Sequence, residues 1–188
     1  MSCRHSGYTR DHHDFYVEPA WCAADLFNRV RINGAIHDPC CGLGTIVDTA
    51  FSMGILATGS DIVDRAGGRF PKIDFLRDEH RYGNIVFNPP YRGAEQVLAH
   101  AISHVGPNGI VAAIVPIQFL ASQRRAKLFM GGACDKVLIH SRRPSMPPGE
   151  LLISSGEAAR HSGSTDYVWV IFRPGRNTSS PVTIGWLG

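Results

Sequence analysis

The stretch NIVFNPPY, residues 84–91, joins an apolar run to residues that could do chemistry. Its first half is typical of a strand buried in a parallel sheet. Asn88 and Pro89 then each present a carbonyl oxygen, and the two prolines limit how far the backbone can move. Tyr91 adds a flat ring on which a planar ligand can stack. The combination indicates rigid hydrogen-bond acceptors beside a stacking surface, although a Pro-Pro turn with a surface tyrosine would show the same pattern.

A glycine-containing turn, DPCCGLGTI at residues 38–46, forms the second candidate site. Gly42 and Gly44 stand between a predicted strand and a predicted helix, where glycine allows a tight turn and close approach of a ligand. In an open α/β sheet, ligands bind beyond the carboxyl ends of the strands. A dinucleotide fingerprint needs a third glycine at position 47, where this chain has Val47, so NAD and FAD are disfavoured.

Two acids close the next two predicted strands, Asp61 in residues 55–62 and Asp74 in residues 72–76. A carboxylate at the first position can accept hydrogen bonds from both hydroxyls of a ribose. The second could accept from an adenine amino group while Phe75 packs on the base. Taken singly, each acid could instead be a turn or cap residue. Together with the glycine turn, they indicate a nucleoside-binding crevice.

The chain of 188 residues is ample for one domain, and its 44% apolar and 19% charged residues are ordinary for a globular protein. The net charge of +3 permits a nucleic-acid partner but does not require one. No apolar run reaches the length of a membrane span, and the N-terminal residues lack the apolar core of a signal peptide. We therefore expect a cytoplasmic protein with no membrane contact, and its five scattered cysteines are expected to be free thiols.

No metal site is expected. Cys40 and Cys41 lack a second cysteine pair at zinc-finger spacing. Residues 11–14, DHHD, could supply ligands, but a polar N-terminal segment explains them as well. The expected organisation is a flexible segment over residues 1–14 and one domain over residues 15–188.

Strand-like and helix-like segments alternate along the rest of the chain, which predicts an α/β fold with a parallel sheet covered on both faces. The expected strands are residues 35–40, 55–62, 72–76, 84–87, 109–116, 136–140 and 167–172, and the expected helices are residues 19–30, 45–53, 94–105 and 117–130. The segment 141–166 is rich in Pro, Gly and Ser, and a loop of this length is usually functional or disordered.

The glycine turn and the NPPY stretch together resemble the motifs of the class I methyltransferases that use S-adenosylmethionine, and within them the amino methyltransferases. The first motif of that family looks like DPFCGSGT, and the catalytic motif [DNS]PP[YFW] is matched in full. Cys40 and Leu43 depart from the first motif, which is matched by Asp38, Pro39, Cys41, Gly42, Gly44 and Thr45. The stretch FYVEPAWCAADLF, residues 15–27, resembles a motif of adenine-specific DNA enzymes, with Glu18-Pro19 where Thr-Pro is common. The resemblance covers about residues 15–173.

The resemblance implies a single Rossmann-like, doubly wound sheet of about seven strands, mostly parallel and with the last strand antiparallel. It implies S-adenosyl-L-methionine as the cofactor, held by Tyr16, Pro19, Asp38, Pro39, Cys41, Gly42, Gly44, Thr45, Asp61, Ile62, Asp74, Phe75 and Asn88. It implies a catalytic set of Asn88, Pro89, Pro90 and Tyr91.

The chemistry expected of this catalytic set follows from the target. An exocyclic amine is a poor nucleophile because its lone pair is delocalised. The side-chain carbonyl of Asn88 and the backbone carbonyl of Pro89 would each accept one N–H, favour tetrahedral nitrogen and stabilise the developing positive charge. Tyr91 would stack on a flipped base. The preferred target is adenine N6 in DNA; an RNA base amine, a protein glutamine, or an idle Rossmann-like module that binds nucleic acid or a partner remain alternatives.

DNA, favoured over RNA as the partner, would need positive groups on the protein. Arg142 and Arg143, at the start of the 141–166 loop, are the candidates for phosphate contacts, and a solvated pair is the alternative. The loop contains no aromatic residue that could pack on a flipped base. A separate recognition domain has no room in the chain, so a specificity subunit or a homodimer is left open.

Overall fold

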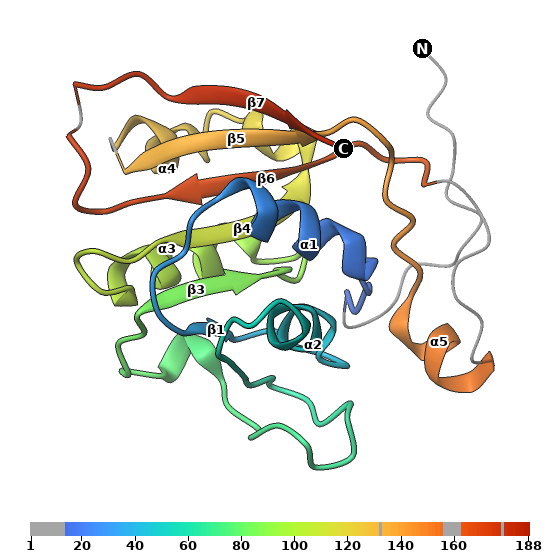
Figure 1. Ribbon diagram of the computed structural model, residues 1–188. Coiled ribbons are helices and arrows are strands. Elements are labelled where there is room, and N and C mark those ends of the chain that lie inside the picture. The colour runs from blue at the N-terminus through green and yellow to red at the C-terminus, as the bar shows by residue number, and fades with distance from the viewer. Residues whose placement is uncertain (1–13, 132, 156–162, 178) are drawn as a thin grey trace.

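The computed structural model describes residues 14–131, 133–155, 163–177 and 179–188. They form one sheet with helices on both of its faces (Figure 1). The strands are β1 (Ile36–Asp38), β2 (Ala57–Gly59), β3 (Asn84–Phe87), β4 (Val111–Pro116), β5 (Cys134–His140), β6 (Tyr167–Phe172) and β7 (Thr183–Leu187). The helices are α1 (Ala20–Arg29), α2 (Thr45–Ser52), α3 (Ala94–His104), α4 (Ala126–Met130) and α5 (Gly149–Ser155), with 3-10 turns η1 (Phe75–Arg77) and η2 (Ile117–Leu120).

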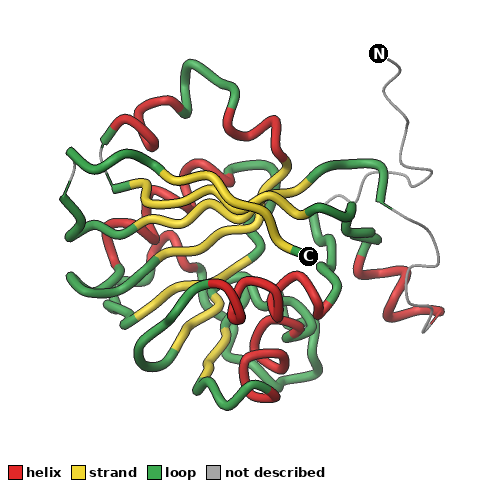
Figure 2. Tube along the Cα trace, turned by 45° about the horizontal axis from the view of Figure 1, so that its top comes forward, coloured by secondary structure: helices red, strands yellow, loops and turns green. Residues whose placement is uncertain are grey.

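The seven strands lie in the order β2-β1-β3-β4-β6-β5-β7, and Figure 2 shows them side by side as one twisted sheet. All neighbouring pairs are parallel except those of β6, which runs antiparallel to both β4 and β5. The expected mostly parallel, seven-stranded Rossmann-like sheet is therefore confirmed. Its antiparallel strand is β6, the last one expected from the sequence, although β7 follows it in the chain.

Strand β1 lies between β2 and β3, so the chain reverses its direction of winding there. The crevice beyond the carboxyl ends of such strands is the usual ligand site of an open α/β sheet. The turn after β1 and the NPPY stretch after β3 therefore meet at one edge of the sheet, as the sequence predicts.

The core consists of two apolar layers, one on each face of the sheet. Helices α1 and α2 contribute to one layer and α3 to the other. Strand β6 is buried along its whole length, and the Trp169 indole N–H donates to the Cys22 carbonyl at 3.0 Å. Complete burial of such side chains stabilises the fold by roughly 1.5–3 kcal/mol each. This packing fixes α1 against the sheet and so fixes the segment that precedes it.

Two predicted elements are wrong. Residues 72–76 form no strand; Lys72 makes one isolated bridge to Asp61, and the Asp74 side chain caps η1 by accepting from the Leu76 amide at 3.2 Å. The expected helix over 117–130 is divided into η2 and α4. The seventh strand is β7, which the sequence analysis did not identify.

The expected flexible segment, residues 1–14, lies outside the described residues except for Asp14. The four described cysteines (22, 40, 41 and 134) are free thiols, as expected. Among the described helices, none is both long enough and apolar enough to cross a bilayer.

His37, on β1, is a buried histidine that the structure holds away from water. Its Nδ1 lies 2.8 Å from the Thr58 hydroxyl and its Nε2 lies 3.1 Å from the Ser60 hydroxyl, while the ring stacks on Tyr82 at 3.9 Å. Burial lowers the pKa of His37 to about 4, against an opposing contribution from Asp78. The folded protein therefore excludes a proton that the unfolded chain binds below its ordinary pKa of about 6.5.

His37→Asn should change the pH dependence of stability. The neutral histidine contributes fully above pH 6.5, and its contribution falls as the pH drops from 6.5 towards 4, by about 2 kcal/mol at pH 5. Urea unfolding of both proteins at pH 8 and pH 5 measures this change. The stability difference between wild type and variant should shift by about that amount in favour of the variant at pH 5. A difference that stays constant between the two pH values would contradict the prediction.

Candidate active site

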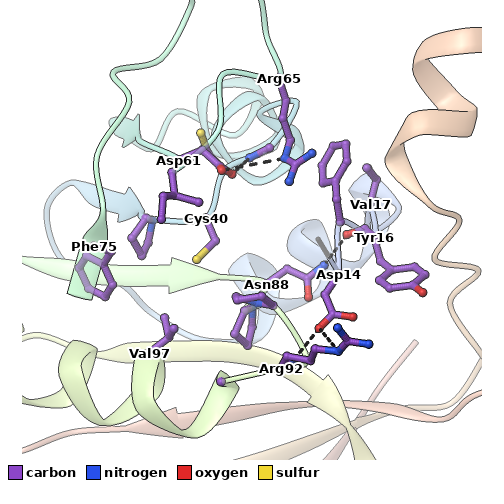
Figure 3. A pocket seen from close by; sticks show the side chains of 18 of the residues that line it. Asp14, Tyr16, Val17, Cys40, Asp61, Arg65, Phe75, Asn88, Arg92 and Val97 are labelled. Carbon is purple, nitrogen blue, oxygen red and sulfur yellow. Dashed lines mark hydrogen bonds and ion pairs between the residues drawn. The ribbon is translucent and has the colours of Figure 1, made fainter. Parts of the chain in front are cut away.

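A cavity of about 230 Å³ lies beyond the carboxyl ends of β1, β2 and β3. Figure 3 shows Asn88 near its centre, with Asp61 and Arg65 on one side, Asp14 and Arg92 on another, and Phe75 and Val97 at the far end. The sequence-predicted residues that line it are Tyr16, Pro39, Cys41, Gly42, Thr45, Asp61, Ile62, Asp74, Phe75, Asn88, Pro89 and Pro90. The fold thus brings together most of the predicted site from five separate stretches of the chain.

Asn88 has a fixed orientation in this cavity. Its amide Nδ2 donates to the Tyr16 carbonyl at 2.9 Å and to the Glu18 carboxylate Oε2 at 2.8 Å. Both hydrogens of the amide are therefore used, and the other end of the group must be the carbonyl oxygen. That oxygen, Oδ1, is buried and has no hydrogen-bond partner among the described residues. An unsatisfied buried acceptor on a residue that lines a cavity is well suited to an N–H donor on a ligand.

The glycine turn after β1 is held by two carboxylates. Asp38 Oδ1 accepts from the Cys40 amide at 3.0 Å, and Asp61 Oδ2 accepts from the Gly42 amide at 2.9 Å. Gly42 has a φ of 51°, a backbone conformation that favours glycine. A Cβ there would lie 2.6 Å from the Phe15 ring, so the position also requires a residue without a side chain.

Asp61 bridges the turn and the strand end that follows it. Besides the Gly42 amide, it accepts from the Val63 amide at 2.9 Å, and the Arg65 guanidinium lies 4.0 Å away. Each carboxylate oxygen has capacity for a further hydrogen bond. Asp61 is therefore both a turn residue, the alternative considered from the sequence, and an acceptor at the cavity wall.

The far end of the cavity is more apolar. Phe75 and Val97 lie at this end (Figure 3), and Asp74, the residue before Phe75, also lines the cavity. Phe75 is buried, whereas the Asp74 carboxylate is partly exposed and pairs with Arg77 at 3.4 Å. An apolar slot with one acceptor at its rim can receive a flat heterocycle that carries an amino group.

Three residues expected to bind the cofactor do not line the cavity. Asp38 is 1% exposed and lies behind the turn, and burial raises the pKa of its carboxyl group well above the usual range. Pro19 is the N-cap of α1, and Gly44 is the N-cap of α2 with a φ of 91°. These residues shape the backbone around the cavity but do not form part of its wall.

Tyr91 also lies outside the cavity lining. Its ring stacks on Tyr16, with 5.0 Å between centroids, and its hydroxyl hydrogen-bonds to that of Tyr167. The sequence analysis expects an open stacking surface, but the structure packs this ring against the core beside Met146. One face of Tyr91 is thus covered by another aromatic residue of the same site.

Arg142 and Arg143 are exposed but already have partners. The Arg142 guanidinium lies 3.7 Å from the Trp21 ring centroid, and Arg143 pairs with Asp166 at 2.6 Å. Neither lines the cavity. Because the ion pair with Asp166 is exposed, it contributes little to stability.

The early part of the 141–166 segment pairs with the residues before α1. The Val17 amide donates to the Pro147 carbonyl at 3.1 Å, and the Gly149 amide donates to the Phe15 carbonyl at 2.8 Å. We call residues 14–18 the strap. In Figure 1, α5 lies beside this strap, at the edge of the molecule. Residues 147–149 of the segment are therefore anchored to the strap, which forms part of the cavity wall.

Sequence reasoning missed much of what the strap contributes. The lining residues absent from the expected set are Asp14, Phe15, Val17, Glu18, Cys40, Leu43, Arg65, Ile73, Leu76, Arg92, Gly93, Gln96 and Val97. Asp14 accepts from the Arg92 amide at 2.7 Å, and Arg65 lies 4.0 Å from the Phe15 ring centroid. The stretch DFYVEP could have indicated this part of the site, because its acidic and aromatic residues directly precede a predicted helix.

Comparison with solved structures supports the fold. A protein from Listeria monocytogenes, proposed to be a class I S-adenosylmethionine-dependent methyltransferase, has a TM-score of 0.54 and 13% identity over 89% of this chain and 62% of its own. The M protein of the type I restriction enzyme EcoKI has a TM-score of 0.54 and 11% identity over 86% of this chain and 44% of its own. A proposed RNA methyltransferase from Pyrococcus horikoshii has a TM-score of 0.59 and 15% identity over 89% of this chain and 91% of its own.

These likenesses show that the chain has the fold of S-adenosylmethionine-dependent methyltransferases. The chain spans less than two thirds of the Listeria protein and less than half of the EcoKI M protein. No protein-family model and no curated protein sequence matches it.

Gly149→Ala should loosen the strap. A Cβ at this position would overlap the Phe15 ring, which is packed between Gly149 and Gly42. Overpacking of this kind typically costs about 1–3 kcal/mol. Urea unfolding should show that loss, and limited proteolysis should cut the 141–155 segment faster. Gly83→Ala is the control, because the new Cβ would lie 3.6 Å from its nearest neighbour, the Ala35 carbonyl oxygen. Equal stability of the two variants would show that Phe15 is not confined.

Proposed function

We propose that this protein transfers a methyl group from S-adenosyl-L-methionine to an exocyclic amino group, with adenine N6 in DNA as the first candidate target. The observation that carries the proposal is the state of Asn88, which lines the cavity and has both amide hydrogens bound, so that its remaining polar atom is the unpartnered acceptor Oδ1. An amino group has two N–H donors for carbonyl oxygens such as this one. A hydroxyl group has one donor, and a carbon target has only weakly donating C–H groups.

The residues present fit the cofactor. Asp61 offers acceptors for ribose hydroxyls, and Asp74 with Phe75 offers an acceptor and an apolar wall for adenine. The Gly42 turn lets the ligand approach the backbone. When bound, S-adenosylmethionine supplies an electrophilic methyl group on a sulfonium, and the C–S bond breaks as the new N–C bond forms.

The protein's own task is to hold and activate the amine. Asn88 Oδ1 and the Pro89 carbonyl would each accept one N–H, which turns the nitrogen lone pair towards the methyl group. They also stabilise the positive charge that develops on nitrogen. One amine proton is then lost to solvent, so the reaction needs no strong base at this position.

The choice of DNA rests on the FYVEP stretch, which resembles a motif of adenine-specific DNA enzymes, and on the kinds of protein that share the fold. These include the EcoKI M protein and the type IIG restriction endonuclease BpuSI, beside a proposed RNA methyltransferase. Arg142 and Arg143 are exposed and are the candidates for contacts with the phosphate backbone of DNA. A specificity subunit or a second copy of the chain could supply base recognition.

Asn88→Ala should lower methyl transfer about 10²–10³-fold, because removal of one preorganised transition-state partner typically has that effect. The assay measures transfer of a tritiated methyl group to DNA, RNA and protein pools. DNA should be labelled by the wild type, and the label should be recovered as N6-methyladenine. Labelling of RNA or protein alone would move the target to that class, and wild-type turnover in the variant would remove Asn88 from the mechanism.

Asp61→Ala should weaken S-adenosylmethionine binding by roughly one to two orders of magnitude, the equivalent of about 1.5–3 kcal/mol for a charge-assisted hydrogen bond. Isothermal titration measures the dissociation constant directly. Asp64→Ala is the control, because Asp64 is an exposed acid in the same loop that caps the Ala66 and Gly68 amides. An unchanged constant in Asp61→Ala would show that Asp61 only shapes the turn.

A further inference from the structure

Glu18 is a carboxylate that the proposed chemistry does not yet use. It is 7% exposed, lies on the strap and lines the cavity. Its Oε2 accepts from Asn88 Nδ2 at 2.8 Å, so it is bonded to the nitrogen end of the amide whose oxygen has no partner among the described residues. In the motif that residues 15–27 resemble, Thr-Pro is common at the place where this chain has Glu18-Pro19.

The surroundings of Glu18 offer it no compensating cation among the described residues. The three other acids that line the cavity are paired with arginines, Asp14 with Arg92 at 3.9 Å, Asp61 with Arg65 at 4.0 Å and Asp74 with Arg77 at 3.4 Å. Glu18 also interacts electrostatically with Asp38, Cys22 and Tyr91, none of which is a cation. Burial of an ionised carboxylate costs free energy unless hydrogen bonds compensate for the loss of water, and the bond from Asn88 compensates in part.

We propose that Glu18 is a positioning residue that acts through Asn88, and that its ionised form increases the rate of methyl transfer. This inference rests on the proposed function of the site. An ionised carboxylate is a stronger acceptor than a neutral one, so it polarises the Asn88 amide and makes Oδ1 a better acceptor in turn. Its charge also favours the positive charge that develops on the amine as the N–C bond forms and the C–S bond breaks.

The orientation of Asn88 does not depend on that charge. The Tyr16 carbonyl holds the second amide hydrogen at 2.9 Å, and a flipped amide would place two carbonyl oxygens face to face. Protonation of Glu18 should therefore weaken Oδ1 as an acceptor without turning it away. Burial raises the pKa of Glu18 to about 7, so this change falls in the neutral range.

The wild-type protein should show kcat/KM that rises with pH to a plateau, because this parameter reports ionisations of the free enzyme. Glu18→Gln keeps the shape and a carbonyl acceptor for Asn88 but cannot ionise. It should lower kcat/KM at pH 8 about tenfold, a fold-change typical of losing the charge from a hydrogen-bonded pair. The acid limb of the profile should disappear.

Two readouts separate this effect from a merely structural one. Glu18→Gln should be at least as stable as the wild type at pH 8, because it no longer buries a charge, and its affinity for S-adenosylmethionine should stay within a few-fold. Glu79→Gln, the same change at an exposed glutamate outside the cavity, should keep both the rate and the acid limb. A Glu18→Gln protein with wild-type rate and an intact acid limb would overturn the proposal.

A measurement on the cofactor-free protein makes the test independent of activity. The ¹³C signal of the Glu18 carboxyl and the side-chain ¹⁵N signal of Asn88 should titrate together, with one midpoint near the value that burial sets for Glu18. An Asn88 signal that ignores this titration would refute the coupling. If the signals titrate together but no methyl transfer is found in any pool, the coupling stands and the proposed function fails.

Discussion

The site depends on one amide group with both of its hydrogens bound. Asn88 directly follows β3, and its Nδ2 donates to the Tyr16 backbone carbonyl and to the Glu18 carboxylate. These two bonds join the edge of the sheet to the strap that precedes α1. The strap can reach that edge because α1 is packed on the sheet, where Trp169 donates to the Cys22 carbonyl. Core packing thus supports the segment whose acceptors fix the orientation of the Asn88 amide.

Acidic residues outnumber basic residues around this amide, although the whole chain has a net charge of +3. Four acids line the cavity, Asp14, Glu18, Asp61 and Asp74, against two arginines, Arg92 and Arg65, which pair with Asp14 and Asp61. A cavity of this kind favours a cationic ligand that also carries hydroxyl donors. This electrostatic character supports a sulfonium cofactor independently of the motif resemblance.

The sequence predicts those parts of the site that follow from strand order. Gly42 lies in the turn after β1, and Asn88 directly follows β3. Both strands are buried and parallel, and parallel strands present their carboxyl ends at one edge, so the meeting of these residues needs no further information. Predictions from local sequence patterns were wrong for residues 72–76 and missed β7. Residues 72–76 alternate like a strand, but Asp74 caps a 3-10 turn instead. Strand β7 is short and largely exposed, and Gly185 interrupts its apolar pattern, so no core periodicity marks it.

The strap could not be predicted, because its structure comes from pairing with a segment about 130 residues away, Val17 with Pro147 and Phe15 with Gly149. Neither partner has a periodic pattern, and only the folded sheet brings them together. That remote pairing also has an electrostatic consequence. It lays the strap against the cavity wall and so removes Glu18 from water, and loss of water is the largest cause of the raised pKa of that carboxyl group. The 141–166 segment, which the sequence analysis connects with DNA through Arg142 and Arg143, therefore also helps to set the ionisation of Glu18.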